Sequence, residues 1–200
     1  RCIAGRRHRQ LVDIGSGSGK FLLHHGGKFG RTHGIEITPA AVKFSQNTLG
    51  LNIVGDLQSV AGEIDVATAW HSLEHFPPAA LASLLAGLEA NVSAGGCVIV
   101  SVPNAASFQA RLFRSHYAFC DVPSHLHQFT ANSLGRLFAA HGFRCVRSVT
   151  SWPYNVFGWI QALLNLAMPG HNYLYYRLKR GQPRISLARD LAGFGLLLGA

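Results

Sequence analysis

The sequence contains few cysteines, few acidic residues and no long uninterrupted apolar run. Its 200 residues include four cysteines, Cys2, Cys97, Cys120 and Cys145, and no two of them form a Cys-x-x-Cys pair. This scatter excludes a dense disulfide framework and favours a reducing compartment. No apolar run reaches the roughly 20 residues of a membrane-spanning helix, and no signal peptide is visible. We therefore expect a cytoplasmic protein.

Acidic residues are scarce in the second half of the chain. The whole sequence has 18 Lys and Arg against 9 Asp and Glu, a formal net charge of +9. Residues 1–104 hold eight basic and seven acidic residues, whereas residues 105–200 hold ten and two, a balance of +8. This asymmetry favours an anionic partner such as a phospholipid surface or a phosphorylated substrate, although a solvated basic face remains an alternative. No recognised nucleic-acid-binding motif accompanies the charge, so we expect no nucleic acid.

A glycine-rich turn is the clearest feature that the sequence does contain. Residues 11–14 form a largely apolar run that predicts a buried strand, and an apolar pattern from residue 21 predicts a helix. Gly15, Gly17 and Gly19 lie between them. Glycines permit positive φ and let a ligand lie against bare backbone, and N–H groups at a helix start favour polar ligand groups. The order strand, glycine turn and helix therefore predicts a ligand site.

The spacing of these glycines separates two classes of cofactor. A dinucleotide fingerprint, G-x-G-x-x-G, needs its third glycine at position 20, which is Lys20. Asp13, just before the turn, would repel the phosphates of a dinucleotide but suits a cationic ligand. The string D-I-G-S-G-S-G over residues 13–19 resembles motif I of class I S-adenosylmethionine (SAM) methyltransferases. A nucleotide-dependent oxidoreductase and a turn without any ligand remain as alternatives.

Two further acids follow the next two predicted strands. Glu36 ends the strand predicted around residues 34–37, seventeen residues after Gly19, where a carboxylate accepts hydrogen bonds from ribose hydroxyls. Asp56 follows a short strand predicted over 51–54, and it matches an acid that contacts the adenine amino group in the methyltransferase family. The alternatives are a solvated strand end for Glu36 and an Asp that closes its own turn for Asp56.

Three later segments extend the resemblance. Residues 64–70 predict a fourth strand, and the segment His71-Ser72-Leu73-Glu74-His75-Phe76 after it is similar to the family loop that borders the methionine end of SAM. Residues 95–104 resemble the family's glycine turn and fifth strand, and residues 121–130 resemble its D-x-P-x-H segment. From about residue 11 to 147, the chain resembles methyltransferase domain family 23, a branch related to the ubiquinone-pathway O-methyltransferases.

This resemblance implies methyl transfer from SAM by an α/β domain with a doubly wound, mostly parallel, Rossmann-like sheet. The alternation of predicted strands and helices favours the same sheet, and residues 143–149 predict its sixth strand. The acceptor is expected to be a small molecule or a lipid- or glycan-linked group, with oxygen as the favoured atom. A non-catalytic SAM-binding or membrane-surface module is the alternative function. The resemblance assigns the following residues to the cofactor: Asp13, Gly15, Gly17, Gly19, Glu36, Asp56 and His71.

Histidines are candidates for the base that a hydroxyl acceptor requires. We favour His125 and His127 as catalytic residues over His71 and His75, because the acceptor is expected to enter over the segment after the fifth strand. Two histidines at i and i+2 near Asp121 could also be read as ligands of a metal site. Helical zinc pairs are spaced i and i+4, and no cysteine lies within three residues of either histidine, so we predict no metal.

Beyond residue 150 the character of the sequence changes. Residues 152–164 are aromatic and apolar, and residues 173–184 mix tyrosines with basic residues. We predict a methyltransferase domain over 1–150 and an apolar, basic, helical appendage over 151–200. Because the family's seventh strand is not visible, we expect the sequence to be truncated. Aromatic and basic residues together favour a segment at the inner membrane face, with a lid or a dimer contact as alternatives.

Overall fold

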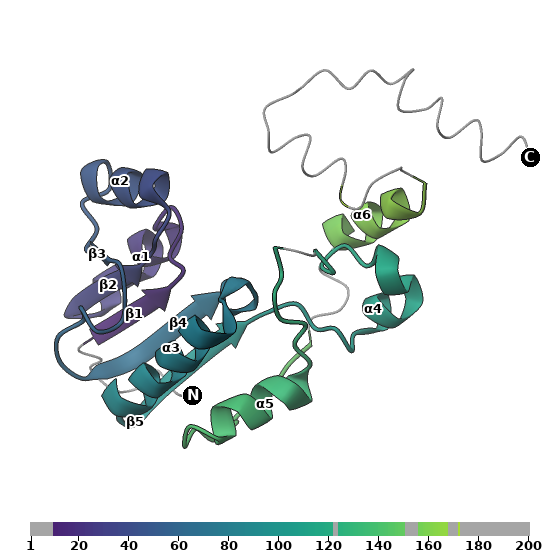
Figure 1. Cartoon of the computed structure of the whole chain (residues 1–200). Coiled ribbons are helices and arrows are strands. Elements are labelled where there is room, and N and C mark those ends of the chain that lie inside the picture. Colours follow the sequence, from purple (N-terminus) through teal and green to yellow (C-terminus); the bar gives the residue numbers. More distant parts are fainter. Residues whose placement is uncertain (1–9, 122–123, 151–155, 168–171, 173–200) are drawn as a thin grey trace, which may run out of the picture. The chain divides into compact units, whose positions relative to one another are not determined.

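The structure of the chain is a computed structural model (Figure 1). It describes residues 10–121, 124–150, 156–167 and 172. The chain divides into two compact units: Arg1–Val102 with Leu134–Cys145, and Pro103–Ser133 with Val146–Ala200. The two units are interleaved along the sequence, because residues 134–145 return to the first. The predicted domain boundary after residue 150 stays a prediction.

A five-stranded sheet forms the centre of the first unit. Its strands are β1 (Gln10–Ile14), β2 (Arg31–Ile35), β3 (Ile53–Val54), β4 (Ile64–Trp70) and β5 (Val92–Ser101). Their order is β3-β2-β1-β4-β5, and every neighbouring pair is parallel. The first described strand, β1, lies in the middle of the sheet. β2 and β3 follow on one side of it, and β4 and β5 follow on the other side. The predicted doubly wound α/β sheet is therefore confirmed.

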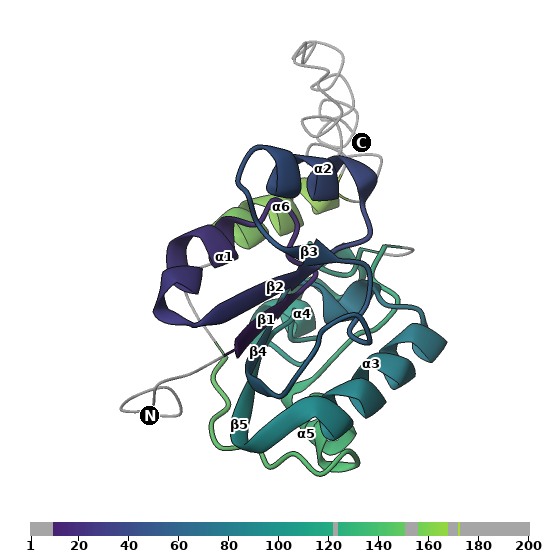
Figure 2. The same ribbon diagram turned by 90° about the vertical axis from the view of Figure 1, so that its left-hand side faces the viewer.

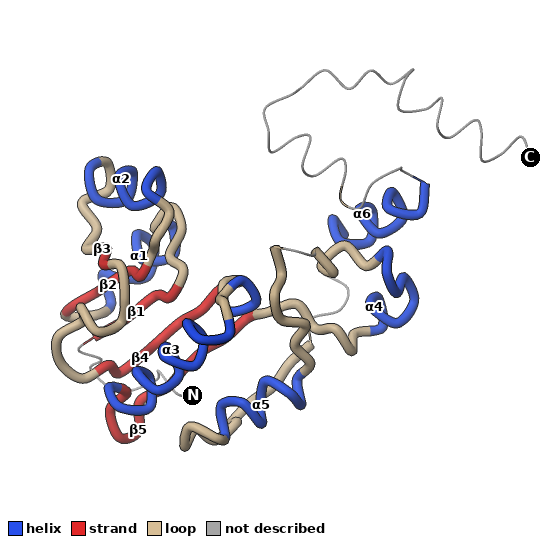
Figure 3. The backbone as a smooth tube through the Cα atoms, in the orientation of Figure 1, coloured by secondary structure: helices blue, strands red, loops and turns tan. Residues whose placement is uncertain are grey.

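Helices connect the strands and continue after them (Figure 3). They are α1 (Lys20–His25), η1 (Gly26–Lys28), α2 (Pro39–Asn47), η2 (Leu73–His75), α3 (Pro78–Asn91), α4 (Phe108–Phe113), η3 (Arg114–His116), α5 (Ala131–Ala139) and α6 (Val156–Ala167), where η denotes a 3₁₀ turn. Within the first unit, α1 and α3 cover opposite faces of the sheet (Figures 1 and 2). Both faces are thus buried, which is why β1 tolerates no exposed residue.

The face of the sheet under α1 and α2 is held by an aliphatic cluster. Leu11 of β1 lies opposite Val66 of β4, and these two pack with Leu22 of α1 and Ile53 of β3, all four being buried. Val42 of α2 packs against the same cluster. Each buried aliphatic side chain stabilises the fold by about 1.5–3 kcal/mol. This packing fixes β1 and α1 on either side of the glycine turn.

The helix α3 covers the other face with a leucine stripe. Its buried residues are Leu81, Leu84, Leu85 and Leu88, which follow the i, i+3, i+4, i+7 spacing of one helix face. Pro78 occupies the first turn, where a proline with fixed φ is well tolerated because that N–H has no helical partner. The predicted helix after Pro77 and Pro78 is confirmed.

Strand boundaries differ from the prediction in four places. The second strand ends at Ile35, so Glu36 and Ile37 lie beyond it. The third strand is shorter, because only Ile53–Val54 pairs with β2. The fifth strand starts earlier, at Val92, since the chain after α3 already pairs with Ile64 of β4. The predicted sixth strand over 143–149 is wrong: these described residues belong to no strand, and Val146 and Val149 are exposed. A β-rich composition makes a strand only when a neighbouring edge pairs with it, and this segment joins no ladder of the described sheet.

The second unit is built around α6, the described part of the predicted appendage. Ala162 of α6 is completely buried among Phe113, Tyr117 and Ala118. Polar groups support this cluster, because the Asn165 side-chain amide donates to the carbonyl of His116 at 3.0 Å. Asn172, also described, donates its side-chain amide to the carbonyl of Ala118 at 2.7 Å, and the rest of the predicted appendage lies outside the described residues. Among the helices that the structure describes, none is long and apolar enough to cross a membrane.

Candidate cofactor-binding site

The glycine turn lies between the carboxyl end of β1 and the start of α1. Gly15 has φ of +70°, and a Cβ there would overlap the side chain of Ser72. Gly17 has φ of +53°, but a Cβ there would meet no atom within 4 Å. Gly15 is therefore required by packing inside the protein. Gly17 leaves bare backbone beside open space, where a ligand can approach closely.

Glu36 lies one residue beyond β2 and closes one side of this turn. One carboxylate oxygen, Oε2, accepts the backbone N–H of Gly17 at 2.8 Å. The other, Oε1, accepts the N–H groups of Ile37 at 2.9 Å and Thr38 at 2.7 Å. These bonds hold the side chain in one orientation, and an ionised carboxylate still has lone pairs to accept ligand hydroxyls.

The charge of Glu36 suits that role. Partial burial raises the pKa of its carboxyl, but hydrogen bonds from Thr38, Gly17 and Ile37 together outweigh burial and leave the pKa below its usual value. At neutral pH the group is therefore an anion. A fixed anion at the end of the second strand is the acceptor that ribose hydroxyls require.

Asp13 lies beneath the turn rather than beside it. It is only 2% exposed, and its Oδ1 accepts the hydroxyl of Thr68, the neighbouring residue on β4, at 2.6 Å. Burial raises the pKa of Asp13 to about 6, against a smaller lowering by the Thr68 hydrogen bond. The predicted role of Asp13 toward a cationic ligand stays a prediction. Because the carboxylate is buried, it would attract such a ligand electrostatically rather than by direct contact.

Asp56 is exposed and closes a turn of its own. Its Oδ1 accepts both the N–H and the hydroxyl of Ser59 at 2.8 Å, and these bonds lower its pKa. The alternative that the sequence left open, an Asp-initiated turn, is therefore present. The Ser59 bonds use only Oδ1, so a contact of this side chain with adenine stays a prediction.

His71 follows the carboxyl end of β4 in a strained conformation. Its φ is +51°, which is uncommon for a residue other than glycine. The backbone N–H donates to the carbonyl of Ser101 on β5 at 2.8 Å. The next residue, Ser72, donates its hydroxyl to the carbonyl of Ile14 at 2.8 Å. The loop after β4 is thus tied to both neighbouring strands, next to the glycine turn.

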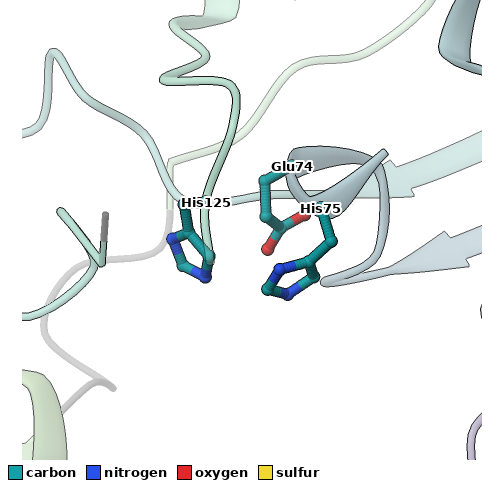
Figure 4. A group of neighbouring side chains, drawn as sticks. All are labelled: Glu74, His75 and His125. Atoms are coloured by element: carbon teal, nitrogen blue, oxygen red, sulfur yellow. The ribbon is translucent and has the colours of Figure 1, made fainter. Parts of the chain in front are cut away.

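Glu74 is a residue of this loop that the sequence did not single out. It projects with His75 from η2, as Figure 4 shows, and it is only 1% exposed. Its Oε1 lies 3.6 Å from Nδ1 of His71. The signal in the sequence was an acid three residues after His71, but its burial depends on the folded loop.

His125 and His127 belong to the second unit. Nδ1 of His125 lies 2.7 Å from the carbonyl oxygen of Phe119, and the ring of His127 stacks on Phe129 with centroids 5.4 Å apart. Both contacts are of the kind that orders a loop. A catalytic role for either histidine stays a prediction.

The arrangement in the first unit is shared with a known family. Residues 2–148 match the family model described as a methyltransferase domain. The chain belongs to this methyltransferase family. Its sheet has the Rossmann-like fold that the resemblance implied. None of the curated proteins matches the chain.

Solved structures share the fold of this methyltransferase. The YcgJ protein of Bacillus subtilis is 17% identical, with a TM-score of 0.60 over 81% of this chain and 78% of that one. A SAM-dependent methyltransferase of Archaeoglobus fulgidus is 19% identical, with a TM-score of 0.56 over 80% and 78%. The match to DesVI from Streptomyces venezuelae is partial. It covers 48% of this chain and 44% of DesVI, at 19% identity and a TM-score of 0.43.

The residues of the methyltransferase fit its cofactor. Open space above Gly17 and the anionic Glu36 lie together at the carboxyl ends of β1 and β2. The ribose of SAM fits the acceptor Glu36, and the positive charge of SAM fits the buried acid Asp13 beneath the same turn. His71 and Asp56 follow the carboxyl ends of β4 and β3 at the same edge of the sheet. The structure thereby gathers all the sequence-predicted cofactor residues at one edge.

Proposed function

We propose that the enzyme transfers the methyl group of SAM to oxygen of a small-molecule or lipid- or glycan-linked acceptor. The observation that supports the SAM part of this proposal most is the hydrogen bond between the Gly17 N–H and the Glu36 carboxylate, which orients the acid proposed to bind the ribose. The closer relation to the ubiquinone-pathway O-methyltransferases, on which the choice of oxygen rests, is part of the same proposal.

Each predicted cofactor residue has a place in this proposal. Glu36 would accept the ribose hydroxyls, the backbone from Gly15 to Gly19 would support the ligand by close approach, and Asp56 would contact the adenine. Asp13 and His71 would serve the methionine end. SAM supplies a methyl group on a sulfonium, so that a neutral thioether leaves. Because the leaving group needs no proton, the main task of the protein is to hold the acceptor in line with that methyl group.

A hydroxyl acceptor adds the need for a base. Histidine suits this role at neutral pH, and the candidates are His71 and His75 in the first unit and His125 and His127 in the second. If the acceptor atom is nitrogen or carbon, no protein base is required. Identification of the acceptor atom therefore decides whether any histidine is catalytic.

The experiment that tests the proposal is a screen of hydroxylated small molecules and lipid- or glycan-linked compounds with SAM labelled in its methyl group. We expect label on an oxygen of one product, located by tandem mass spectrometry. Label on nitrogen or carbon would contradict the choice of oxygen. SAM binding without transfer to any acceptor would favour the alternative, a non-catalytic SAM-binding or membrane-surface module.

A peripheral position at the inner face of the membrane is a second part of the proposal. The helix α6 exposes Val156, Ile160 and Leu163, each more than half exposed and spaced i, i+4, i+7 along one face. In the same unit, α4 exposes Phe108 and Leu112, and Arg111 and Arg114 beside them are exposed too. Apolar side chains with cations beside them suit an anionic bilayer surface.

A further inference from the structure

Glu74 is a deeply buried acid in the loop after β4. It is 1% exposed, and neither of its oxygens has a hydrogen-bond partner in the part of the chain that the structure describes. Burial of an acid in this state is costly unless a positive or donating group compensates it. Nδ1 of His71 lies 3.6 Å from Oε1 of this carboxylate and can form an ion pair with it.

His71 is held so that its two ring nitrogens face different groups. Nδ1 faces Glu74, and Nε2 lies 3.4 Å from the hydroxyl oxygen of Ser101 on β5. The side chain of His71 is 58% exposed. The hydroxyl of Ser101 shows that an oxygen fits beside Nε2 within about a hydrogen bond's reach. The ring therefore lies between a buried acid beside Nδ1 and a hydroxyl beside Nε2, and more than half of the side chain is exposed.

The backbone strain of His71 points to the same arrangement. A non-glycine residue in the left-handed region is unfavourable and persists only where its surroundings fix it. Here the N–H bond to Ser101 and the Ser72 bond to Ile14 fix it on both sides. Because Ser72 also packs against Gly15, the same loop that holds His71 forms the wall of the glycine turn. The loop that holds His71 is therefore also part of the candidate cofactor site.

We propose that Glu74 is a positioning residue that keeps the proton of neutral His71 on Nδ1, so that Nε2 takes the proton of the acceptor hydroxyl. This inference rests on the proposed transfer to oxygen. The acceptor O–H bond breaks and its proton goes to Nε2. The oxygen bonds to the methyl carbon as the carbon–sulfur bond breaks, and that electron pair stays on sulfur. The imidazolium is stabilised by the Glu74 carboxylate until its proton leaves to water.

The charged groups around the ring support this reading. Glu74 is the acid beside Nδ1 of His71, and Ser101 is the polar residue beside Nε2. His75 lies on η2 directly after Glu74, so its titration must be resolved from that of His71.

The test is a ¹⁵N-histidine NMR titration of the full chain, with Glu74→Gln as the variant. In the wild type we expect neutral His71 as the Nδ1–H tautomer. The Gln substitution removes the charge while keeping the shape, and we expect it to lower the proton affinity of His71 tenfold or more. Glu89→Gln is the matched control: Glu89 contacts His141 at 2.9 Å, so this variant should shift His141 and leave His71 unchanged.

Two results would overturn the proposal. One is an Nε2–H tautomer of His71 in the wild type, and the other is an identical His71 titration in the wild type and Glu74→Gln. Calorimetry with SAM separates this failure from failure of the proposed function. A wild-type chain that does not bind SAM refutes the function, whereas normal SAM binding with an unchanged His71 titration refutes only the role of Glu74. With an acceptor found in the labelled-SAM screen, His71→Gln should lower kcat about 10²–10⁴-fold, and an unchanged kcat would also overturn the proposal.

Discussion

The backbone N–H of Gly17 donates to the carboxylate of Glu36 at 2.8 Å, across nineteen positions of sequence. This bond joins the turn after β1 to the residue that follows β2. It orients the acid before any ligand binds, and it fixes the backbone of the turn through the side chain of Glu36. Both features lower the cost of ordering the site on binding.

The first prediction concerns the bare backbone at Gly17. Gly17→Ala adds a Cβ into open space at a positive φ, which strains the backbone by about 1–2 kcal/mol and occupies the space of a close ligand. We expect a small loss of thermal stability and a larger loss of SAM affinity, measured by calorimetry. Gly27→Ala is the control, because a Cβ there also meets no atom within 4 Å but φ is not positive. Equal SAM affinity in both variants would contradict a ligand at Gly17.

The second prediction is a pH dependence from Asp13. Its pKa in the folded state, about 6, lies above the ordinary 3.8, so the folded state holds this proton more tightly. The stabilisation is complete below about pH 4 and is lost as the pH rises through 6. Asp13→Asn removes this loss, and we expect it to be more stable than the wild type above pH 6 by about 1–3 kcal/mol.

Denaturant unfolding from pH 4 to 8 measures this difference. A wild-type stability that does not fall between pH 4 and 6 relative to Asp13→Asn would show that Asp13 is not a buried acid of raised pKa. The SAM affinity of the same variant tests the predicted attraction between Asp13 and the cationic end of the cofactor. If the carboxylate attracts SAM, Asp13→Asn should bind SAM more weakly than the wild type although it is more stable.

The third prediction concerns the histidines of the second unit. If His125 or His127 is the base for a hydroxyl acceptor, its replacement by Ala should lower turnover about 10²–10⁴-fold and leave SAM affinity unchanged. Steady-state kinetics with the acceptor from the labelled-SAM screen measures this. Near-normal turnover in both single variants would leave them as the loop-ordering residues that their contacts with Phe119 and Phe129 describe.

The fourth prediction concerns the exposed face of α6. Ile160→Gln with Leu163→Gln keeps the helix but removes its exposed apolar surface, so we expect weaker flotation with vesicles that contain anionic lipid. Wild-type binding should weaken as salt rises, because each basic residue near the surface contributes about 1 kcal/mol. Leu23→Gln on α1 is the control, since Leu23 is as exposed as Ile160. A wild-type protein that stays in solution with anionic vesicles at low salt would refute the membrane proposal.

The glycine turn and the acid that follows the second strand could be predicted from the sequence because their signals are local. Gly15 and Gly17 are needed for backbone geometry, and Glu36 follows them at a spacing set by one helix and one strand. The fourth strand was predicted with its observed bounds, since residues 64–70 are a nearly continuous apolar run. Such a run is typical of a central parallel strand that is buried on both faces.

Features that depend on distant partners could not be predicted in this way. Residues 143–149 have the composition of a strand, but a strand exists only with a paired edge. Glu74 reads as an ordinary loop acid, and only the folded loop shows that it is buried beside His71. The Ser59 contacts of Asp56 were foreseen as an alternative, because an Asp-initiated turn is itself a local feature.

The measurement that tests the account most directly is a calorimetric titration of the full chain with SAM. We expect micromolar-range binding by the wild type and no comparable binding of a nicotinamide dinucleotide. Glu36→Ala should weaken SAM binding by about 1–3 kcal/mol, the cost of a lost charged hydrogen-bond partner, whereas Glu63→Ala, at an exposed acid before β4, should not change it. Equal SAM affinity in the wild type and Glu36→Ala, or preference for the dinucleotide, would contradict the account.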